Sequence, residues 1–303
     1  MSAKKSKPSP GSDTEGKVSA ELKKPDSRSV QVDLGGMSHC GAVRPANEDC
    51  FLVAQFDRGM QVLLTNVPEG LLQERHGETA YIMLVADGIG GAPAGKIASR
   101  TAIRVLLDLL NDTPDWIMQL TDETAPRVLA RTAKRFRQIE EAFIEQTQAN
   151  PNLSGMGTTM TAACIYGSSA VVSHVGHSCA YLFRYGRLQR LTGEHTVAQE
   201  LLKAGAIREE DVGAHPFRRT LTKAISTNRG NAQAELHIVP LRDGDQLLLC
   251  TDGLSSMVKE AKIEEMLLKP GTAADTCKSL VDLVLAGGGR DDVTVTLARF
   301  HTR

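Results

Sequence analysis

The sequence predicts an α+β fold, in which antiparallel strands and amphipathic helices occupy different stretches of the chain. Residues 96–110 and 126–148 carry apolar side chains at helical spacing. Beyond Gly155, short apolar segments are separated by turn residues such as Tyr166-Gly167-Ser168-Ser169, which is typical of β-hairpins. The chain therefore combines two long helices with a second half that is rich in strands.

The composition argues against several classes of protein. The chain has 303 residues, of which 41% are hydrophobic and 23% charged, and its formal net charge is -1. This length suffices for one large domain or two small ones. The balanced charge argues against a nucleic-acid or membrane-surface protein. No apolar run is long enough to span a bilayer, and the N-terminus lacks the apolar segment of a signal peptide.

The cysteines indicate a reducing environment. The six of them, at positions 40, 50, 164, 179, 250 and 277, form no Cys-x-x-Cys pair. Cys164 and Cys250 lie inside apolar runs. This pattern is typical of reduced core cysteines in a cytoplasmic protein, rather than of a disulfide framework or a zinc site.

The N-terminal segment differs from the rest of the chain. Residues 1–29 are rich in Lys, Ser, Pro and Glu, so we expect a disordered leader before a folded domain at 30–303. Within this domain, a polar turn from Arg44 to Asp49 leads directly into a strand candidate, Cys50 to Ala54. A further hairpin strand is predicted at 61–64.

The stretch from Tyr81 to Gly95 is the most informative one. Its apolar run, Tyr81 to Ala86, predicts a strand buried on both faces. The run ends in Asp87, a carboxylate that would be costly to bury unpaired. Glycine-rich chain follows, and a helical pattern begins at Lys96. A strand that ends in an acid beside flexible backbone is typical of a ligand site.

The other predicted elements follow in order. The helix at 96–110 ends before Pro114, and the helix at 126–148 ends at Asn150-Pro151-Asn152. Residues 293–297 alternate between apolar and polar side chains, which predicts a strand with one buried face. The remaining strands are predicted at 158–165, 170–175, 180–185, 188–191, 235–239 and 246–250, and the remaining helices at 197–204, 261–268 and 274–285.

Acidic residues stand at the ends of four predicted strands. Glu48 and Asp49 precede one strand, Asp87 and Asp252 follow two others, and Asp291 precedes the last. Because Asp-Gly is a common turn, each acid alone is weak evidence for a site. Strand ends can converge at one edge of a sheet, however, and crowded carboxylates repel one another and need cations between them.

The donor types restrict the choice of metal. Oxygen ligands with no neighbouring His or Cys favour Mg²⁺ or Mn²⁺ over Zn²⁺. A carboxylate that bridges two such ions is a standard means of generating hydroxide and of activating a phosphoryl centre.

Seven short motifs stand in a fixed order along the chain. They are Arg44-Pro-Ala-Asn-Glu48-Asp49, Val85-Ala-Asp87-Gly88-Ile-Gly-Gly91, Gly155-Met-Gly-Thr-Thr159, Val175-Gly-His177-Ser178, Leu191-Thr-Gly-Glu-His195, Thr251-Asp252-Gly-Leu254 and Gly289-Arg-Asp291-Asp292-Val-Thr294. Each motif is weak alone. Together and in this order, they make the chain resemble the bacterial form of the metal-dependent type-2C protein serine/threonine phosphatases over about residues 31–300.

The resemblance implies both a fold and a metal site. The family fold stacks two antiparallel β-sheets face to face with helices outside, an αββα sandwich with the metal site at one edge. Two Mn²⁺ or Mg²⁺ ions would be held by Asp49, Asp87, the backbone carbonyl of Gly88, Asp252 and Asp291. Asp87 would bridge the two ions.

The resemblance also implies an activity. Arg44 would bind the substrate phosphate through its planar guanidinium, and Glu48 would act through metal-bound water. Water would attack phosphoserine or phosphothreonine in proteins directly, with no phosphoenzyme. We expect a cytoplasmic monomer in signalling, acting on phosphorylated proteins and on a serine/threonine kinase and its targets, with no nucleic-acid or membrane partner.

Residues 194–227 match the flap that borders the cleft in this family and shapes the choice of substrate. Basic residues in this stretch would either attract phosphoproteins or form a solvated surface balanced by nearby glutamates. They are Lys203, Arg208, Arg218 and Arg219.

Several residues depart from the family pattern. Ala92 stands where His is usual, Lys96 replaces a Glu, and Gly176-His177-Ser178-Cys179 replaces Gly-Asp-Ser-Arg. Ser154 stands where some relatives carry an acid tied to a third metal, and Asp292 replaces an Asn. These changes leave the ligands of two metal ions intact but place a third ion in doubt.

Two other interpretations remain open. Gly90 to Lys96 fits the P-loop pattern G-x-x-x-x-G-K between a strand and a helix. Against a nucleotide-hydrolysing P-loop protein, Ile97 replaces the hydroxyl residue that would reach the metal, and Pro93 lacks an N–H. The departures from the family pattern favour instead a catalytically impaired regulator that binds phosphoproteins on the same fold.

Overall fold

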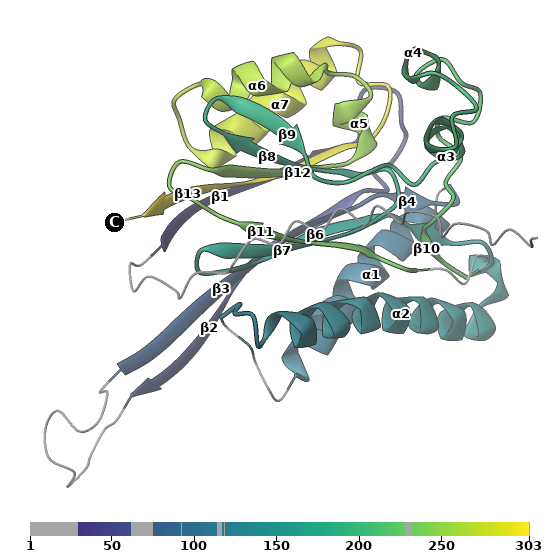
Figure 1. Ribbon diagram of the computed structural model, residues 1–303. Coiled ribbons are helices and arrows are strands. Elements are labelled where there is room, and N and C mark those ends of the chain that lie inside the picture. Colours follow the sequence, from purple (N-terminus) through teal and green to yellow (C-terminus); the bar gives the residue numbers. More distant parts are fainter. Residues whose placement is uncertain are drawn as a thin grey trace, which may run out of the picture.

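Two β-sheets stack face to face, with helices on both outer faces, in the computed structural model of the protein (Figure 1). The structure describes residues 30–61, 75–91, 93–113, 117, 119–227 and 232–302. The predicted leader at 1–29, most of the predicted strand at 61–64 and Ala92 lie outside these residues. In the part of the chain that is described, no helix combines the length and the apolar character needed to cross a membrane.

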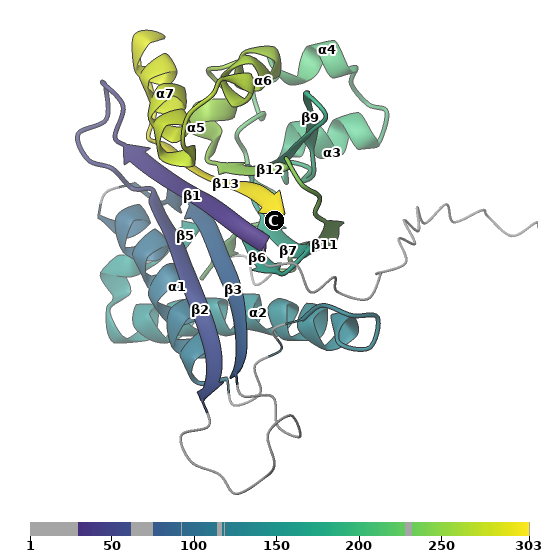
Figure 2. The same cartoon turned by 90° about the vertical axis from the view of Figure 1, so that its left-hand side faces the viewer.

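The first sheet joins the two ends of the described chain. Its strands follow the order β1-β13-β12-β8-β9, and all neighbours are antiparallel. Figure 2 shows β1 and β13 side by side, paired from Val30 with Thr302 to His39 with Val293. The bounds are β1 Val30–His39, β8 Cys179–Arg184, β9 Arg187–Arg190, β12 Gln246–Cys250 and β13 Val293–Thr302.

The second sheet contains the strand that ends at Asp87. Its order is β11-β7-β6-β3-β2, again antiparallel throughout. Because β3 has antiparallel neighbours on both sides, it does not belong to the βαβ unit of parallel strands in which a nucleotide-binding loop would connect strand and helix. The bounds are β2 Cys50–Gln61, β3 Arg75–Ala86, β6 Met160–Tyr166, β7 Ser169–Val175 and β11 Glu235–Pro240.

A small third sheet borders the end of β3. It has the order β10-β5-β4, with β4 at Gly88–Ile89, β5 at Gly157–Thr158 and β10 at Ile225–Ser226. Since β10 lies within the predicted flap at 194–227, this sheet ties the C-terminal part of the flap to the chain that follows Asp87.

The helices form the outer layers of the sandwich (Figure 1). The second sheet is covered by α1 and α2, and the first by α5, α6 and α7, while α3 and α4 lie in the predicted flap. The bounds are α1 Ala94–Asn111, α2 Ala125–Ala149, α3 Val197–Lys203, α4 Glu209–Val212, α5 Asp252–Ser255, α6 Glu260–Leu268 and α7 Ala273–Ala286. A short 3₁₀ helix, Pro151–Leu153, follows α2, so the predicted stop at Asn150-Pro151 is confirmed.

Apolar side chains fill three layers. On β3, Ile82 and Leu84 face α1 and α2, whereas Met83 and Val85 face the other sheet. All four side chains are at most 1% exposed. The prediction of a strand buried on both faces is therefore confirmed. This double burial fixes the direction in which the strand delivers Asp87.

The last strand differs from its prediction. Alternation at 293–297 predicted one buried face, but Val293 to Phe300 are all buried, so that prediction is wrong. Val293 and Val295 pack toward the helices, and Ala298 and Phe300 pack between the sheets. The polar residues of the pattern are threonines, whose side chains are small enough to fill space between two sheets.

The orientation of α2 predicts how two neighbouring substitutions differ. Phe143 is fully buried among the residues of α1 and β3, whereas the Ile144 side chain is 39% exposed. We expect Phe143→Ala to lower the free energy of unfolding by about 3–5 kcal/mol and Ile144→Ala by under about 1 kcal/mol. Urea denaturation of both variants measures the difference, and equal losses would contradict this orientation of the helix.

Candidate functional site

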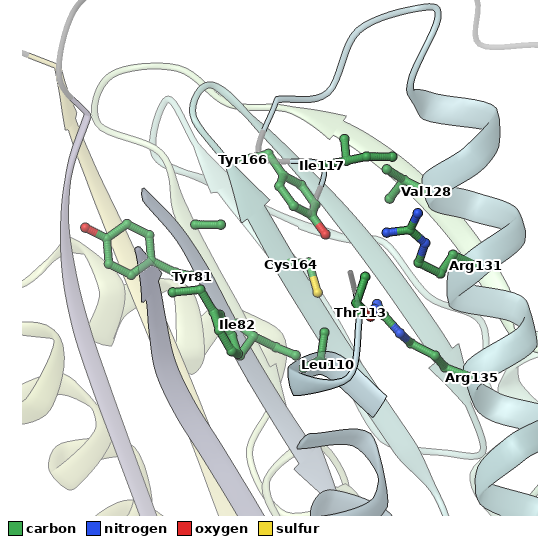
Figure 3. Close-up of a pocket in the computed structure, with 12 residues that line it drawn as sticks. Tyr81, Ile82, Leu110, Thr113, Ile117, Val128, Arg131, Arg135, Cys164 and Tyr166 are labelled. Carbon is green, nitrogen blue, oxygen red and sulfur yellow. Dashed lines mark hydrogen bonds between the residues drawn. The ribbon is translucent and has the colours of Figure 1, made fainter. Parts of the chain in front are cut away.

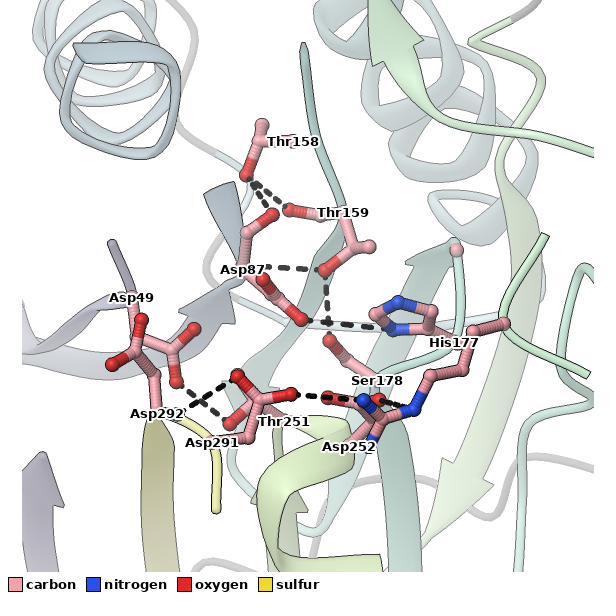
Figure 4. A network of polar contacts seen from close by, with 12 residues as sticks. Asp49, Asp87, Thr158, Thr159, His177, Ser178, Thr251, Asp252, Asp291 and Asp292 are labelled. Atoms are coloured by element: carbon pink, nitrogen blue, oxygen red, sulfur yellow. Dashed lines mark hydrogen bonds and ion pairs between the residues drawn. The ribbon is translucent and has the colours of Figure 1, made fainter. Parts of the chain in front are cut away.

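The predicted acids meet at one edge of the sandwich (Figure 4). Asp49 directly precedes β2, Asp87 directly follows β3, and Asp252 opens α5 after β12. Asp291 lies two residues before β13. The Asp87 carboxylate interacts electrostatically with Asp49, Asp252 and Asp291. The prediction that separate strand ends converge is therefore confirmed for all four aspartates.

A chain of two hydrogen bonds through Thr251 holds Asp49. Thr251 Oγ1 donates to Asp49 Oδ2 at 2.8 Å, and the backbone N–H of Thr294 donates to Thr251 Oγ1 at 3.0 Å. These contacts tie the start of β2 to β12 and β13. Asp49 is 6% exposed, and its Oδ1 is buried with no hydrogen-bond partner among the described residues. One oxygen of this acid is therefore held, and the other is left for a ligand.

The backbone around Asp87 is equally constrained. Its N–H donates to Thr159 Oγ1 at 3.2 Å, and its carbonyl accepts from the Thr159 N–H and from Thr158 Oγ1, both at 2.9 Å. Gly88 follows directly, and a Cβ at this position would overlap the carbonyl of Gly95. Only glycine lets the start of α1 approach the end of β3 this closely.

Crowding changes the acidity of these carboxylates. Burial, and next to it the charge of Asp87, raises the pKa of Asp49 well above its usual range. Burial also raises the pKa of Asp87, and the charges of Asp252, Asp291 and Asp292 raise it further. Such a group of hard oxygen donors, in which Asp49 Oδ1 and Asp292 Oδ1 are buried without a hydrogen-bond partner among the described residues, fits divalent cations.

Two arginines contact the acids. Arg44 Nη2 lies 2.6 Å from Asp291 Oδ1, and the Arg44 side chain remains 43% exposed. Arg219, from the flap, places Nη1 3.2 Å from Asp291 Oδ2 and Nε 3.7 Å from Asp252 Oδ2. Sequence reasoning treated Arg219 only as one of several basic flap residues. Nothing in its local sequence shows that the flap folds back onto the acids.

Glu48 lies beside this cluster. The side chain is 6% exposed, and burial raises its pKa, an effect that Arg44 opposes and that Asp292 and Asp291 reinforce. The N–H of Glu48 donates to Asp292 Oδ2 at 2.8 Å, and its carbonyl accepts from Ser99 Oγ at 2.6 Å. Asp292, which stands where the family has Asn, therefore positions the backbone of Glu48.

A histidine also faces the acids. His177 Nδ1 lies 3.7 Å from Asp87 Oδ2 (Figure 4). The assumption that no histidine neighbours the carboxylates is therefore wrong. The sequence motif Val175-Gly-His177-Ser178 includes this histidine, but the sequence shows only that it replaces the Asp of the family pattern. Its position depends on the turn between β7 and β8, which the sequence pattern does not specify.

A separate cavity of about 40 Å³ lies between α1, α2 and the second sheet (Figure 3). Its lining is mainly apolar and includes Ile82, Leu110 and Tyr166. Arg135 reaches its wall and donates to Thr113 Oγ1 at 2.9 Å. No predicted site residue lines this cavity, so the acid cluster is the candidate site.

The two stacked sheets with helices outside match the architecture that the seven motifs imply for a metal-dependent phosphatase. A family model described as protein phosphatase 2C matches residues 71–282. The chain therefore belongs to the protein phosphatase 2C family. The family and the fold predicted from the seven motifs are confirmed, and the interpretation as a P-loop protein is wrong.

Relatives of known name agree with this assignment. The serine/threonine phosphatase stp of Listeria innocua is 34% identical over 216 residues, which cover 71% of this chain and 83% of that protein. The crystal structure of the serine/threonine phosphatase PstP/Ppp of Mycobacterium tuberculosis matches with a TM-score of 0.71 and 31% identity, over 89% of this chain and 99% of that one. A catalytic domain of PstP in complex with two manganese ions matches with a TM-score of 0.70 and 30% identity, over 90% and 100% of the two chains.

The raised pKa values predict how pH affects the protein when it is stripped of metal with a chelator. Since the folded-state pKa values of Asp49 and Asp87 lie above their unfolded values, stability is lost as pH rises through the folded pKa values. We expect Asp87→Asn to raise the melting temperature of the stripped protein near pH 8, with little effect near pH 3, where the aspartate is protonated in both states. Each unit of pKa shift removed corresponds to about 1.4 kcal/mol.

Thermal unfolding with and without Mn²⁺ measures this effect. Added Mn²⁺ should raise the melting temperature of the wild type and raise that of Asp87→Asn much less. A stripped Asp87→Asn variant that melts below the wild type near pH 8 would show that the cluster is not under electrostatic strain.

Proposed function

We propose that this protein hydrolyses phosphoserine and phosphothreonine esters in proteins with the help of two divalent cations. The observation that carries the proposal is the convergence of Asp49, Asp87, Asp252 and Asp291 at one edge of the sandwich. Four separate segments bring these acids together against their mutual repulsion. The family membership and the manganese complex of a relative support the same function.

In this proposal, Asp87 would bind both of two Mn²⁺ or Mg²⁺ ions. Asp49, the carbonyl of Gly88, Asp252 and Asp291 would also serve as protein ligands. Such ions, when bound, supply the Lewis acidity that makes water a nucleophile near neutral pH. The chain's own contribution is to hold the carboxylates in place through the hydrogen bonds of its threonines.

Arg44 and Glu48 would act on the substrate and on water. The guanidinium of Arg44 is exposed on one side and contacts Asp291 on the other, so it can reach a phosphate at the rim of the site. Glu48 is buried beside it and would orient water through a hydrogen bond. With water as the direct nucleophile, the reaction needs no phosphoenzyme.

The cellular setting extends the proposal. We further propose that the protein acts in cytoplasmic signalling, as a monomer that reverses the action of a serine/threonine kinase. Its six cysteines, all free, are compatible with a reducing compartment. The kinase itself and its phosphorylated targets would be its protein partners.

A metal-dependent assay tests the proposed function. Phosphate release from phosphoserine and phosphothreonine peptides should rise with added Mn²⁺ and exceed release from phosphotyrosine peptides. Asp252→Asn should lower kcat by at least about 100-fold, because it removes a charged metal ligand. Tight phosphopeptide binding by the wild type without any turnover would instead identify a phosphoprotein-binding regulator.

The flap contact predicts a role for Arg219 in substrate binding. Arg219 contacts the acids, whereas Arg218 next to it makes no side-chain contact with them among the described residues. We expect Arg219→Ala to raise KM for phosphopeptides by about tenfold, the loss of one charge-assisted contact of about 1.4 kcal/mol. Arg218→Ala, the matched control, should change KM less than twofold or so. Equal effects in steady-state kinetics would contradict this role.

A further inference from the structure

Two compact groups of histidine and acidic side chains occur in the described part of the chain. They are His174 with His195 and Glu235, and His177 with Asp87 and Asp252. In the first group, each ring nitrogen has a polar partner. His174 Nδ1 lies 2.8 Å from Thr161 Oγ1, and its Nε2 lies 3.0 Å from the Gly193 carbonyl. His195 Nδ1 accepts from the Gly176 N–H at 3.1 Å, and its Nε2 lies 3.5 Å from Glu235.

The second group leaves a nitrogen without a partner. His177 Nδ1 is buried and has no hydrogen-bond partner among the described residues, and the side chain is 12% exposed. The distance of 3.7 Å to Asp87 Oδ2 is too long for a hydrogen bond. A buried ring nitrogen that faces a carboxylate without bonding to it needs a third group between the two.

The backbone holds His177 in this position from both sides. Gly176 has a φ of +114°, and a Cβ there would overlap the side chain of Thr159. The Gly176 carbonyl accepts from the His195 N–H at 2.7 Å. On the other side, Ser178 Oγ lies 2.8 Å from Thr159 Oγ1, next to the N–H of Asp87. The ring is therefore carried by a rigid turn that is tied to the end of β3.

The distances allow a shared cation after a small adjustment. Two neighbouring ligand atoms on an octahedral ion lie about 3.0 Å apart when both bonds are about 2.1 Å long. His177 Nδ1 and Asp87 Oδ2 are 3.7 Å apart, so they need to approach each other by under about 1 Å. One ligand atom from each of Asp87, His177 and Asp252 lies within 4.8 Å of the others, so small side-chain rotations bring all three to one ion.

We propose that His177 is a nitrogen ligand of the metal centre, with Nδ1 binding the cation that Asp87 and Asp252 share. This assignment rests on the proposed metal-dependent function. Imidazole suits transition-metal ions, whereas all-oxygen sites suit Mg²⁺. The centre of this protein therefore discriminates against Mg²⁺ more strongly than a centre with an aspartate at position 177.

Pulsed electron paramagnetic resonance of the Mn²⁺-loaded protein tests the assignment directly. A coordinated imidazole couples its ¹⁴N nucleus to the electron spin, and carboxylates and water do not. We expect ¹⁴N modulation in the wild type, and its replacement by a ¹⁵N signal when the chain carries ¹⁵N-labelled histidine. This labelling needs no substitution, so it does not depend on the folding of a variant.

Two variants locate the nitrogen. His177→Asp should lose the modulation while still binding Mn²⁺, and Glu235→Gln, the matched control in the other histidine group, should keep it. Affinity for Co²⁺ should fall about tenfold or more in His177→Asp, and affinity for Mg²⁺ should change less. Absence of modulation in the fully loaded wild type, or its survival in His177→Asp, overturns the assignment.

The spectroscopic result is independent of turnover. Nitrogen coupling in a protein that hydrolyses no phosphopeptide would overturn the proposed function and leave the ligand assignment standing. Turnover by a protein without nitrogen coupling would do the reverse. Failure of the wild type to bind Mn²⁺ at all would overturn both.

Discussion

Repulsion among carboxylates is the constraint on which the site depends. Asp49 and Asp87 come from different strands, and both are pushed toward protonation by burial and by neighbouring negative charge. No local interaction would bring such groups together, so the free energy of the apolar core must offset their repulsion. The three-layered core does this by burying both faces of β3 and β13, the strands that adjoin two of the acids. A cation held between the acids would relieve this repulsion.

The same strands also set the precision of the site. Thr251 on the β12 side and Thr294 on β13 form a hydrogen-bonded chain that ends on Asp49. Gly253 packs so closely on the chain at Asp292 that a Cβ there would overlap a backbone carbonyl. Because these contacts involve central strands and backbone atoms, the acids cannot drift apart without disturbing the core. The site is thus rigid where metals are expected.

The sequence predicts those features that a short stretch of residues determines, and it misses those that depend on neighbours in space. The apolar run before Asp87 specifies a buried strand by itself, and an acid after a strand can be read directly. The double burial of β13 was missed because Thr294 and Thr296 look solvent-facing in an alternating pattern, while their neighbours in space decide their burial. His177 and Arg219 were missed as neighbours of the acids for a related reason. A turn and a flap place them, and neither conformation is encoded in a short periodic pattern.

Two of the residues that depart from the family pattern, His177 and Cys179, lie in contact with polar groups at the edge of the sandwich. At the Gly-Asp-Ser-Arg position, His177 returns a metal-binding atom where an acid is usual. Cys179 lacks the guanidinium of the usual arginine, yet Arg190 on β9 brings another one to within 2.9 Å of its sulfur. Arg190 is in turn held by Glu194 at 2.8 Å, at the start of the flap. A nitrogen facing Asp87 and a guanidinium beside Cys179 give this edge of the sandwich different polar groups from those of the family pattern, and under the proposal above they change the donors that a cation would meet.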